Sequence, residues 1–175
     1  LNKLNECLCS NLHIKKKQRI QDSGYVSNLC SLTFSSVEMC KDLIMYGCIP
    51  NKTYDGYIKK NLFSDNIELK IAFLRGYLDG DGYINKNKKS VSSLSYVIHN
   101  YKVMNYVLKA IISVSGIVPT VRYEYDELGH GAYRLRITNR KDFFAFLDVL
   151  YKNPTIYMKR KYDRYLEYKT SRPKT

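Results

Sequence analysis

Two acidic residues, Asp79 and Asp81, alternate with Gly80 and Gly82 at the carboxyl end of a predicted helix that begins near Ile67. A carboxylate at this end of a helix faces the negative pole of the helix dipole, which costs about 0.3–1 kcal/mol, so a nearby cation is expected. Because glycine accepts positive φ, a turn at the two glycines would place Asp81 beyond the helix end, beside carbonyl oxygens that suit Mg²⁺. A simple turn that leads into a hairpin is the structural alternative.

Residue spacing in the same helix predicts two packing faces, one of large apolar residues and one of small residues. Its large apolar residues recur with helical spacing and are expected to pack on a sheet: Ile71, Leu74 and Leu78. A second face carries only small residues, Ala72, Gly76 and Gly80, which would let another helix approach closely. Glycine inside a helix costs roughly 0.5–1 kcal/mol relative to alanine, so Gly76 is expected to be compensated by such packing. The small residues are therefore candidates for a helix–helix interface, with a merely tolerated glycine as the alternative.

The elements that position this helix follow from apolar spacing, capping residues and turn residues. Apolar spacing in Leu1–Leu8 predicts the end of a helix. Strands are predicted at 12–20, 25–34, 82–86, 90–98, 119–125 and 132–138. Helices are predicted at 37–46, from 67 to about 79, and at 101–114, 141–151 and 156–168. From residue 67 the order is αββαββα followed by a terminal helix, which indicates an α+β fold.

The order strand, turn, strand, helix occurs twice in the chain. Four apolar residues of the first occurrence recur 103 residues further along, where Leu32, Phe34, Leu43 and Ile44 become Leu135, Ile137, Phe146 and Leu147. The repeat predicts that residues 1–49 form the rear half of a first domain and that 67–168 form a complete second one. Residues 50–66 are polar and rich in turn residues, which indicates a linker, and 169–175 are expected to be a disordered tail.

Strand parity predicts a basic face on the complete domain. In the strand 132–138, Leu135 and Ile137 are expected to point to the core, so the residues between them point the other way. The same parity on the neighbouring strands completes a set of donors and acceptors that suits base edges in a DNA major groove. The members of this set are Tyr83, Asn85, Thr120, Arg122, Glu124, Arg134, Arg136 and Thr138.

Other basic residues extend this pattern. Lys15, Lys17 and Arg19 form a similar stripe in the first part of the chain, and Lys86 and Lys88 are expected to contact phosphates from a hairpin tip. With 29 Lys and Arg against 16 Asp and Glu, the net charge is +13, which implies an anionic partner. The 17 tyrosines could stack on single-stranded bases, but their helical spacing favours core and rim positions.

The composition excludes several protein classes. At 45% hydrophobic residues the chain is globular, and no apolar run approaches the roughly 18 residues of a membrane span. The first residues lack a signal-peptide pattern, so a soluble intracellular protein is expected. The five cysteines are odd in number and lie within the first 48 residues, without the spacing of a zinc site, which favours reduced thiols over disulfides.

The segment Leu74–Gly82, LRGYLDGDG, resembles the LAGLIDADG motif of homing endonucleases in its leucines, its helix glycine and its D-x-D-G ending. The order αββαββα is also that of the family, and the resemblance covers 67–168 and, as a rear half, 1–49. It implies helices packed on a saddle-shaped antiparallel sheet. It also implies a sequence-specific endonuclease that cuts double-stranded DNA by Mg²⁺-dependent phosphodiester hydrolysis and serves the mobility of an intron or intein.

The resemblance assigns roles to individual residues. It implies that Asp81, with the Gly80 carbonyl beside it, binds the catalytic metal at the foot of two packed motif helices. Lys159 resembles the family's lysine that organises water, and Lys52 resembles the same element of the first domain. His99 or Asn100 would be the polar residue that ends the second strand.

One departure from the family pattern leaves the activity open. No segment before Ile67 reads as a first motif helix, although cutting both DNA strands needs an acid from each of two helices. Residues 1–49 begin in the middle of a domain, so an upstream segment that carries the first motif is expected. The alternatives are that two chains pair through Ala72 and Gly76, or that the protein is a non-cleaving relative that acts as an RNA-splicing maturase or a DNA-binding regulator.

Overall fold

The computed structural model describes residues 1–50, 56–59, 62–63, 65–85 and 93–170. The chain divides into two compact units, Leu1–Lys41 and Asp42–Thr175. The division lies within the helix α2, Val37–Met45, upstream of the predicted linker. The domain bounds inferred from the sequence therefore stay predictions.

The first unit consists of one short helix, a hairpin and the start of α2. The helix α1 (Asn2–Cys7) precedes the strands β1 (Lys15–Ile20) and β2 (Val26–Ser31), which pair antiparallel from Lys15 opposite Ser31 to Ile20 opposite Val26. All of residues 1–41 are described, and none of them is buried. The unit therefore has secondary structure without a core of its own.

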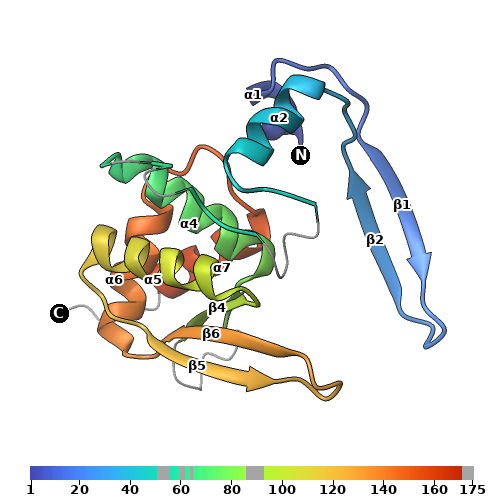
Figure 1. Ribbon diagram of the computed structural model, residues 1–175. Helices are drawn as coiled ribbons and strands as arrows, with labels where there is room; N and C mark the ends of the chain where they lie inside the picture. The colour runs from blue at the N-terminus through green and yellow to red at the C-terminus, as the bar shows by residue number, and fades with distance from the viewer. Residues whose placement is uncertain (51–55, 60–61, 64, 86–92, 171–175) are drawn as a thin grey trace. The chain divides into compact units, whose positions relative to one another are not determined.

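The second unit contains the predicted complete domain (Figure 1). Its helices are α4 (Ile67–Asp81), α5 (Tyr101–Ser115), α6 (Arg140–Tyr151) and α7 (Lys159–Thr170). Its strands are β3 (Tyr83–Ile84), β4 (Leu94–Ile98), β5 (Thr120–Tyr125) and β6 (Gly131–Ile137). They form one antiparallel sheet in the order β3-β4-β6-β5, with the helices on one side of it. The predicted αββαββα order with a terminal helix, and the α+β class, are confirmed.

Local sequence signals explain where these helices begin and end. Asn66, Asn100 and Asn139 are N-caps of α4, α5 and α6, and each side chain accepts a hydrogen bond from a backbone amide of the first helical turn. Gly116 ends α5 in the left-handed conformation, with φ 70°. These caps satisfy backbone groups that would otherwise be left without partners.

The core lies between the helices and the sheet. Leu135 and Ile137 point inward as parity predicted, with exposures of 0% and 3%. Leu74 and Leu78 of α4 are fully buried, and Ile71 packs against the same core. The apolar face of α4 is therefore fixed on the sheet, which determines the direction of its remaining faces. Among the described residues, no helix is long and apolar enough to cross a membrane.

Candidate functional site

The two acids at the end of α4 lie in opposite environments. Asp79 is buried, and its carboxylate accepts hydrogen bonds from the Tyr151 hydroxyl at 2.6 Å and the Met158 amide at 2.8 Å. Asp81 is exposed, and no hydrogen bond or ion pair to its carboxylate is found in the described part of the chain. Asp79 therefore holds α4 to its neighbours, whereas Asp81 is open to a ligand.

The prediction of a positive-φ turn at Gly80 and Gly82 is wrong. The helix continues through Gly80 to Asp81, and Gly82 follows with φ −84° and ψ 166°, an extended conformation open to any residue. Space rather than φ requires a glycine here, because a Cβ on Gly82 would collide with the side chain and carbonyl of Leu78. A left-handed cap is unnecessary because a lysine side chain binds the last carbonyls of the helix.

This lysine, Lys161 of α7, is a site residue that the sequence analysis missed. Its ammonium group donates to the carbonyl oxygens of Leu78, of Asp79 at 2.9 Å and of Gly82 at 2.6 Å, and the residue is 2% exposed. Burial, followed by the positive charge of Arg160, lowers the pKa of Lys161 to about 8.

A weak signal for Lys161 was present in the sequence. It shares one helical face with Tyr165 and Tyr168, and these three are the buried residues of α7. The face reads as aromatic rather than charged, so a lysine on it requires buried partners. Only the tertiary structure shows that these partners are backbone carbonyls of α4.

Lys159, the predicted catalytic lysine, points elsewhere. Its side chain is 83% exposed, and its Nζ lies 2.6 Å from the Asp163 carboxylate. This hydrogen bond, together with the charge of Asp163, raises the pKa of Lys159. A catalytic role for Lys159 stays a prediction, and it requires release from Asp163.

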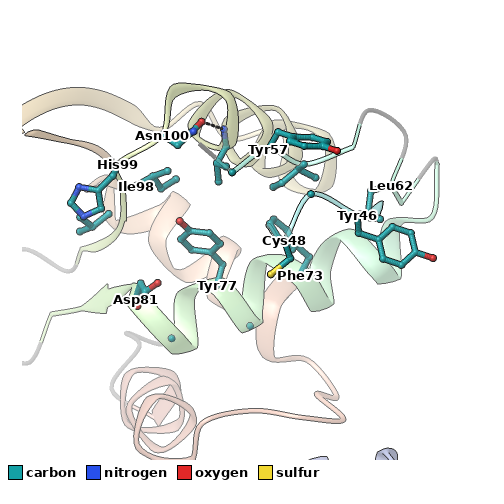
Figure 2. Close-up of a pocket in the computed structure, with 17 residues that line it drawn as sticks. Tyr46, Cys48, Tyr57, Leu62, Phe73, Tyr77, Asp81, Ile98, His99 and Asn100 are labelled. Carbon is teal, nitrogen blue, oxygen red and sulfur yellow. Dashed lines mark hydrogen bonds between the residues drawn. The ribbon is translucent and has the colours of Figure 1, made fainter. Parts of the chain in front are cut away.

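A pocket of about 820 Å³ lies along the exposed side of α4 (Figure 2). Asp81 and His99 lie at one end of it, Tyr46 and Leu62 at the other, and the Tyr77 ring points into it between them. Burial raises the pKa of Tyr77 to about 12, and the negative charge of Asp81 adds to this shift. The hydroxyl of Tyr77 therefore stays a neutral donor beside Asp81.

The predicted polar residues at the end of β4 differ in their roles. Asn100 is buried and caps α5 by accepting hydrogen bonds from the amides of Lys102 and Val103. His99 is exposed on the pocket wall, with Nδ1 3.1 Å from the Gly131 carbonyl oxygen. Both residues line the pocket, but only His99 is exposed, because the Asn100 side chain is occupied in capping α5.

The stripe of small residues on α4 is open. Ala72, Gly76 and Gly80 are exposed, and a Cβ on either glycine would meet no atom of the described residues within 4 Å. Gly76 and Gly80 form part of the pocket wall. The compensation expected for Gly76 is therefore not supplied by the described residues of this chain, and the helix interface stays a prediction.

The comparison with protein families bears directly on this helix. The model of the LAGLIDADG-like domain matches residues 68–151, a segment that contains α4 and continues to the end of α6. This segment is a LAGLIDADG-like domain. The resemblance seen in Leu74–Gly82 is thereby confirmed, and α4 is the motif helix of the domain.

One solved structure shares the fold of this chain at low sequence identity. Full-length DUF199/WhiA from Thermatoga maritima is 13% identical, with a TM-score of 0.53, and the match covers 100% of this chain and 50% of that one. This chain therefore spans about half the length of that structure, and the likeness concerns the fold alone. The group I intron-encoded homing endonuclease I-CeuI, in complex with DNA, is 18% identical over 77% of this chain and 66% of its own, with a TM-score of 0.43. A comparison with curated protein sequences finds no match.

The donor set at the end of the motif helix suits a hard cation but is incomplete. Asp81 offers an exposed carboxylate, and the Gly80 carbonyl is not among the three that Lys161 binds. Carboxylate and carbonyl oxygens are ligands that Mg²⁺ accepts, together with water and phosphate oxygens. Within the described residues, no three His, Cys, Asp or Glu side chains converge on one point. Beyond Asp81 and the Gly80 carbonyl, a cation here would take further ligands from water, from phosphate oxygens or from residues other than the described ones.

The outward face of the sheet carries the predicted basic residues, but two of them are paired. Arg134 Nε lies 2.8 Å from Glu124 Oε2, an ion pair without hydrogen-bond geometry, and Arg136 Nη2 lies 3.3 Å from Glu124 Oε1. Arg122 is exposed and lies opposite Arg134 in the sheet. One carboxylate thus holds two guanidinium groups next to a third.

The remaining predicted contacts are distributed over both units. Tyr83 is exposed on β3, and the Asn85 carbonyl accepts a hydrogen bond from the Tyr168 hydroxyl at 2.7 Å. The first-unit residues Lys15, Lys17 and Arg19 are exposed and share one face of β1. Three further predicted residues lie outside the described residues: Lys52, Lys86 and Lys88.

Proposed function

We propose that the LAGLIDADG-like domain is half of the active site of a sequence-specific, double-strand DNA endonuclease. The observation that carries this proposal is the exposed Asp81 carboxylate at the end of the motif helix, next to the open face of Gly76 and Gly80. An acid at the negative end of a helix is unfavourable unless it has a cation. An open glycine face is unfavourable in a helix unless another helix packs on it. One partner helix with its own acid would compensate both costs.

The sheet supports the binding half of this proposal. Arg122, Arg134 and Arg136 lie on the face opposite the helices, and bidentate guanidinium groups recognise guanine edges in the major groove. Glu124 orients two of them, which lowers the entropy lost when they bind a base. The net charge of +13 supplies attraction to phosphates, which positions a protein on DNA without specifying the sequence.

The catalytic half rests on Asp81. Bound Mg²⁺ would activate a water molecule and stabilise the leaving oxygen of the cleaved phosphodiester. Asp81 would hold the ion, and Tyr77 would remain a neutral donor beside that carboxylate. Lys159, if released from Asp163, would stabilise negative charge near the phosphate. The second acid would come from another motif helix, either in a further part of the protein or in a second copy of the chain.

Asp81→Asn tests this proposal because the substitution keeps the shape of the side chain and removes its charge. Duplexes are first selected from a randomised pool by gel shift with the parental protein, and cleavage of the selected duplexes is then measured in Mg²⁺ and in Ca²⁺. Asp81→Asn should lose cleavage by orders of magnitude and keep its affinity for DNA. Glu68→Gln, an exposed acid in the first turn of the same helix, is the matched control and should keep both.

Two results would contradict the proposal. Cleavage by Asp81→Asn at the parental rate would exclude Asp81 as the metal ligand. Failure of the parental protein to enrich any duplex would exclude the DNA-binding half. Both measurements use the same selected duplexes, so binding and cleavage are judged on one substrate.

A second candidate is a non-cleaving LAGLIDADG protein, a DNA-binding regulator or an RNA-splicing maturase. The observation that favours it is the single exposed acid at the end of the motif helix, without a converging group of ligands in the described residues. Enrichment of specific duplexes or structured RNA, combined with no cleavage in Mg²⁺ or Mn²⁺, would favour this candidate over the endonuclease.

A further inference from the structure

Three side chains of α7 bind the backbone on both sides of Asp81. Lys161 donates to the carbonyls of Leu78, Asp79 and Gly82, and two further residues of the same helix act beyond that point. Arg164 Nη1 donates to the Ile84 carbonyl at 2.6 Å, and the Tyr168 hydroxyl donates to the Asn85 carbonyl at 2.7 Å. The three donors recur at i, i+3 and i+7, so they share one face of α7.

The acceptors of these donors form one continuous stretch of chain. They lie between the last turn of α4 and Asn85, the residue that follows β3, and each is a backbone carbonyl rather than a side chain. The last carbonyls of a helix have no intrahelical partner and are usually satisfied by a glycine cap or by water. Here a buried ammonium group takes that place, so the helix passes directly into an extended strand at Gly82.

We propose that Lys161 is a positioning residue that fixes the carboxyl end of the motif helix and thereby holds the Asp81 carboxylate where a divalent cation binds. Lys161 contacts the carbonyls of residues 78, 79 and 82, which lie on both sides of Asp81, and it leaves the Asp81 side chain itself exposed. This inference rests on the proposed function, because it gives Asp81 the role of metal ligand.

Burial and charge favour this role over simple filling of the core. A lysine that is 2% exposed has lost its hydration, and this loss is reflected in a pKa lowered to about 8. An apolar side chain of similar volume would fill the space without that cost. The carbonyl contacts are therefore the property that distinguishes lysine here, and they act on the backbone that carries Asp81.

Paramagnetic broadening by Mn²⁺ in amide NMR spectra of the full chain tests the proposal without any cleavage assay. In the parental protein, Mn²⁺ should broaden the amides of residues 80–82 before others, and Asp81→Asn should abolish this selectivity. Lys161→Met should raise the Mn²⁺ concentration needed by at least about tenfold, as is usual when a group that orients a ligand is removed. Lys109→Met, an exposed lysine of α5, is the matched control and should behave as the parent.

The outcomes separate this inference from the proposed function. If Mn²⁺ broadens residues 80–82 equally in the parent and in folded Lys161→Met, Lys161 has no positioning role, although Asp81 remains a metal ligand. If the parent shows no broadening that depends on Asp81, the metal site of the proposed function fails first, and this inference with it.

Two further variants guard against loss of folding. Lys161→Arg keeps a cationic donor and should lie between the parent and Lys161→Met. Tyr168→Phe removes one hydroxyl at the far end of the same contact and should shift the Mn²⁺ concentration less than Lys161→Met does. If Lys161→Met is unfolded and both milder variants match the parent, the proposal is overturned.

Discussion

Two regions of the chain have the same local structure and opposite burial. In the first, β1 and β2 lead to α2, and in the second, β5 and β6 lead to α6. Even the turns agree. In the first turn, the Gly24 amide donates to the Gln21 carbonyl, and the Gln21 amide donates to the Tyr25 carbonyl. In the second turn, the Gly129 amide donates to the Asp126 carbonyl, and the Asp126 amide donates to the His130 carbonyl. Both glycines have positive φ, +77° and +81°. Local sequence is thus sufficient for the hairpins.

The repeated apolar positions show what local sequence does not provide. Leu135, Ile137, Phe146 and Leu147 are 0% to 3% exposed. Their counterparts Phe34, Leu43 and Ile44 are 42% to 47% exposed, and Leu32 is partly buried. The second hairpin and helix are covered by α4, α5 and the strand β4, which precede them in the chain. Burial therefore depends on the preceding half of the domain, and four predictions test this difference.

The largest effect is expected from truncating corresponding core positions. Phe146→Ala removes a fully buried ring and should lower the free energy of unfolding by about 3–5 kcal/mol. Leu43→Ala, at the corresponding exposed position, should change it by less than about 0.5 kcal/mol. Chemical unfolding of both variants measures the two values. A loss of several kcal/mol in the free energy of unfolding for Leu43→Ala would show that Leu43 is buried in solution, and it would contradict the difference in burial between the two regions.

A second prediction concerns α7, which holds the end of the motif helix in the covered region. The folded-state pKa of Lys161 is lowered from 10.5 to about 8, so between these values the unfolded chain binds more protons than the folded chain. The stability difference between the parent and Lys161→Met should therefore shift in favour of the parent as pH rises from about 8 towards 10.5, and stay constant below that window. Urea unfolding of both proteins across this range measures the difference. A difference independent of pH would show that Lys161 titrates normally in the folded state.

The third prediction compares the basic faces of the two hairpins. Arg134 and Arg136 are paired to Glu124, whereas Lys15, Lys17 and Arg19 on β1 have no acid opposite them in the strand register. Glu124→Gln removes a negative charge, so it should tighten binding to random duplex DNA and steepen the salt dependence of that binding. It should also weaken the preference for selected duplexes. The free energy of unfolding should fall by about 1 kcal/mol or less. Glu127→Gln, at the tip of the same hairpin, is the control. Unchanged discrimination would mean that Glu124 does not orient the arginines.

The smallest effect on the chain itself is expected on the open face of α4. Gly76→Leu should leave stability unchanged or raise it by up to about 1 kcal/mol, because leucine is the better helix former and no atom of the described residues lies within 4 Å of a Cβ at this position. Any pairing of α4 with a second helix should be lost in the same variant. Thermal unfolding and sedimentation check the two parts. A large loss of stability would show that Gly76 is already covered within the chain.

Much of the fold could be predicted because its signals are local. Alternating apolar residues in the strands, helical apolar spacing and turn residues located the elements, and strand parity correctly assigned Leu135 and Ile137 to the core. The motif Leu74–Gly82 identified the family, because its residues are consecutive and can be recognised without knowledge of the sheet. These features depend on residues a few positions apart, where chain geometry alone determines which side chains are neighbours.

The candidate site was predictable only in part, because it joins residues about 80 positions apart. The sequence singled out Asp81 as the candidate ligand but gave no role to Asp79. Only the packing of α4 against Tyr151 and Met158 shows that Asp79 is a structural anchor. The sequence presents Lys159 and Lys161 as one charged run, and only the contact of α7 with α4 buries the second. Long-range packing decides which charges lose water, and that loss separates structural from reactive groups.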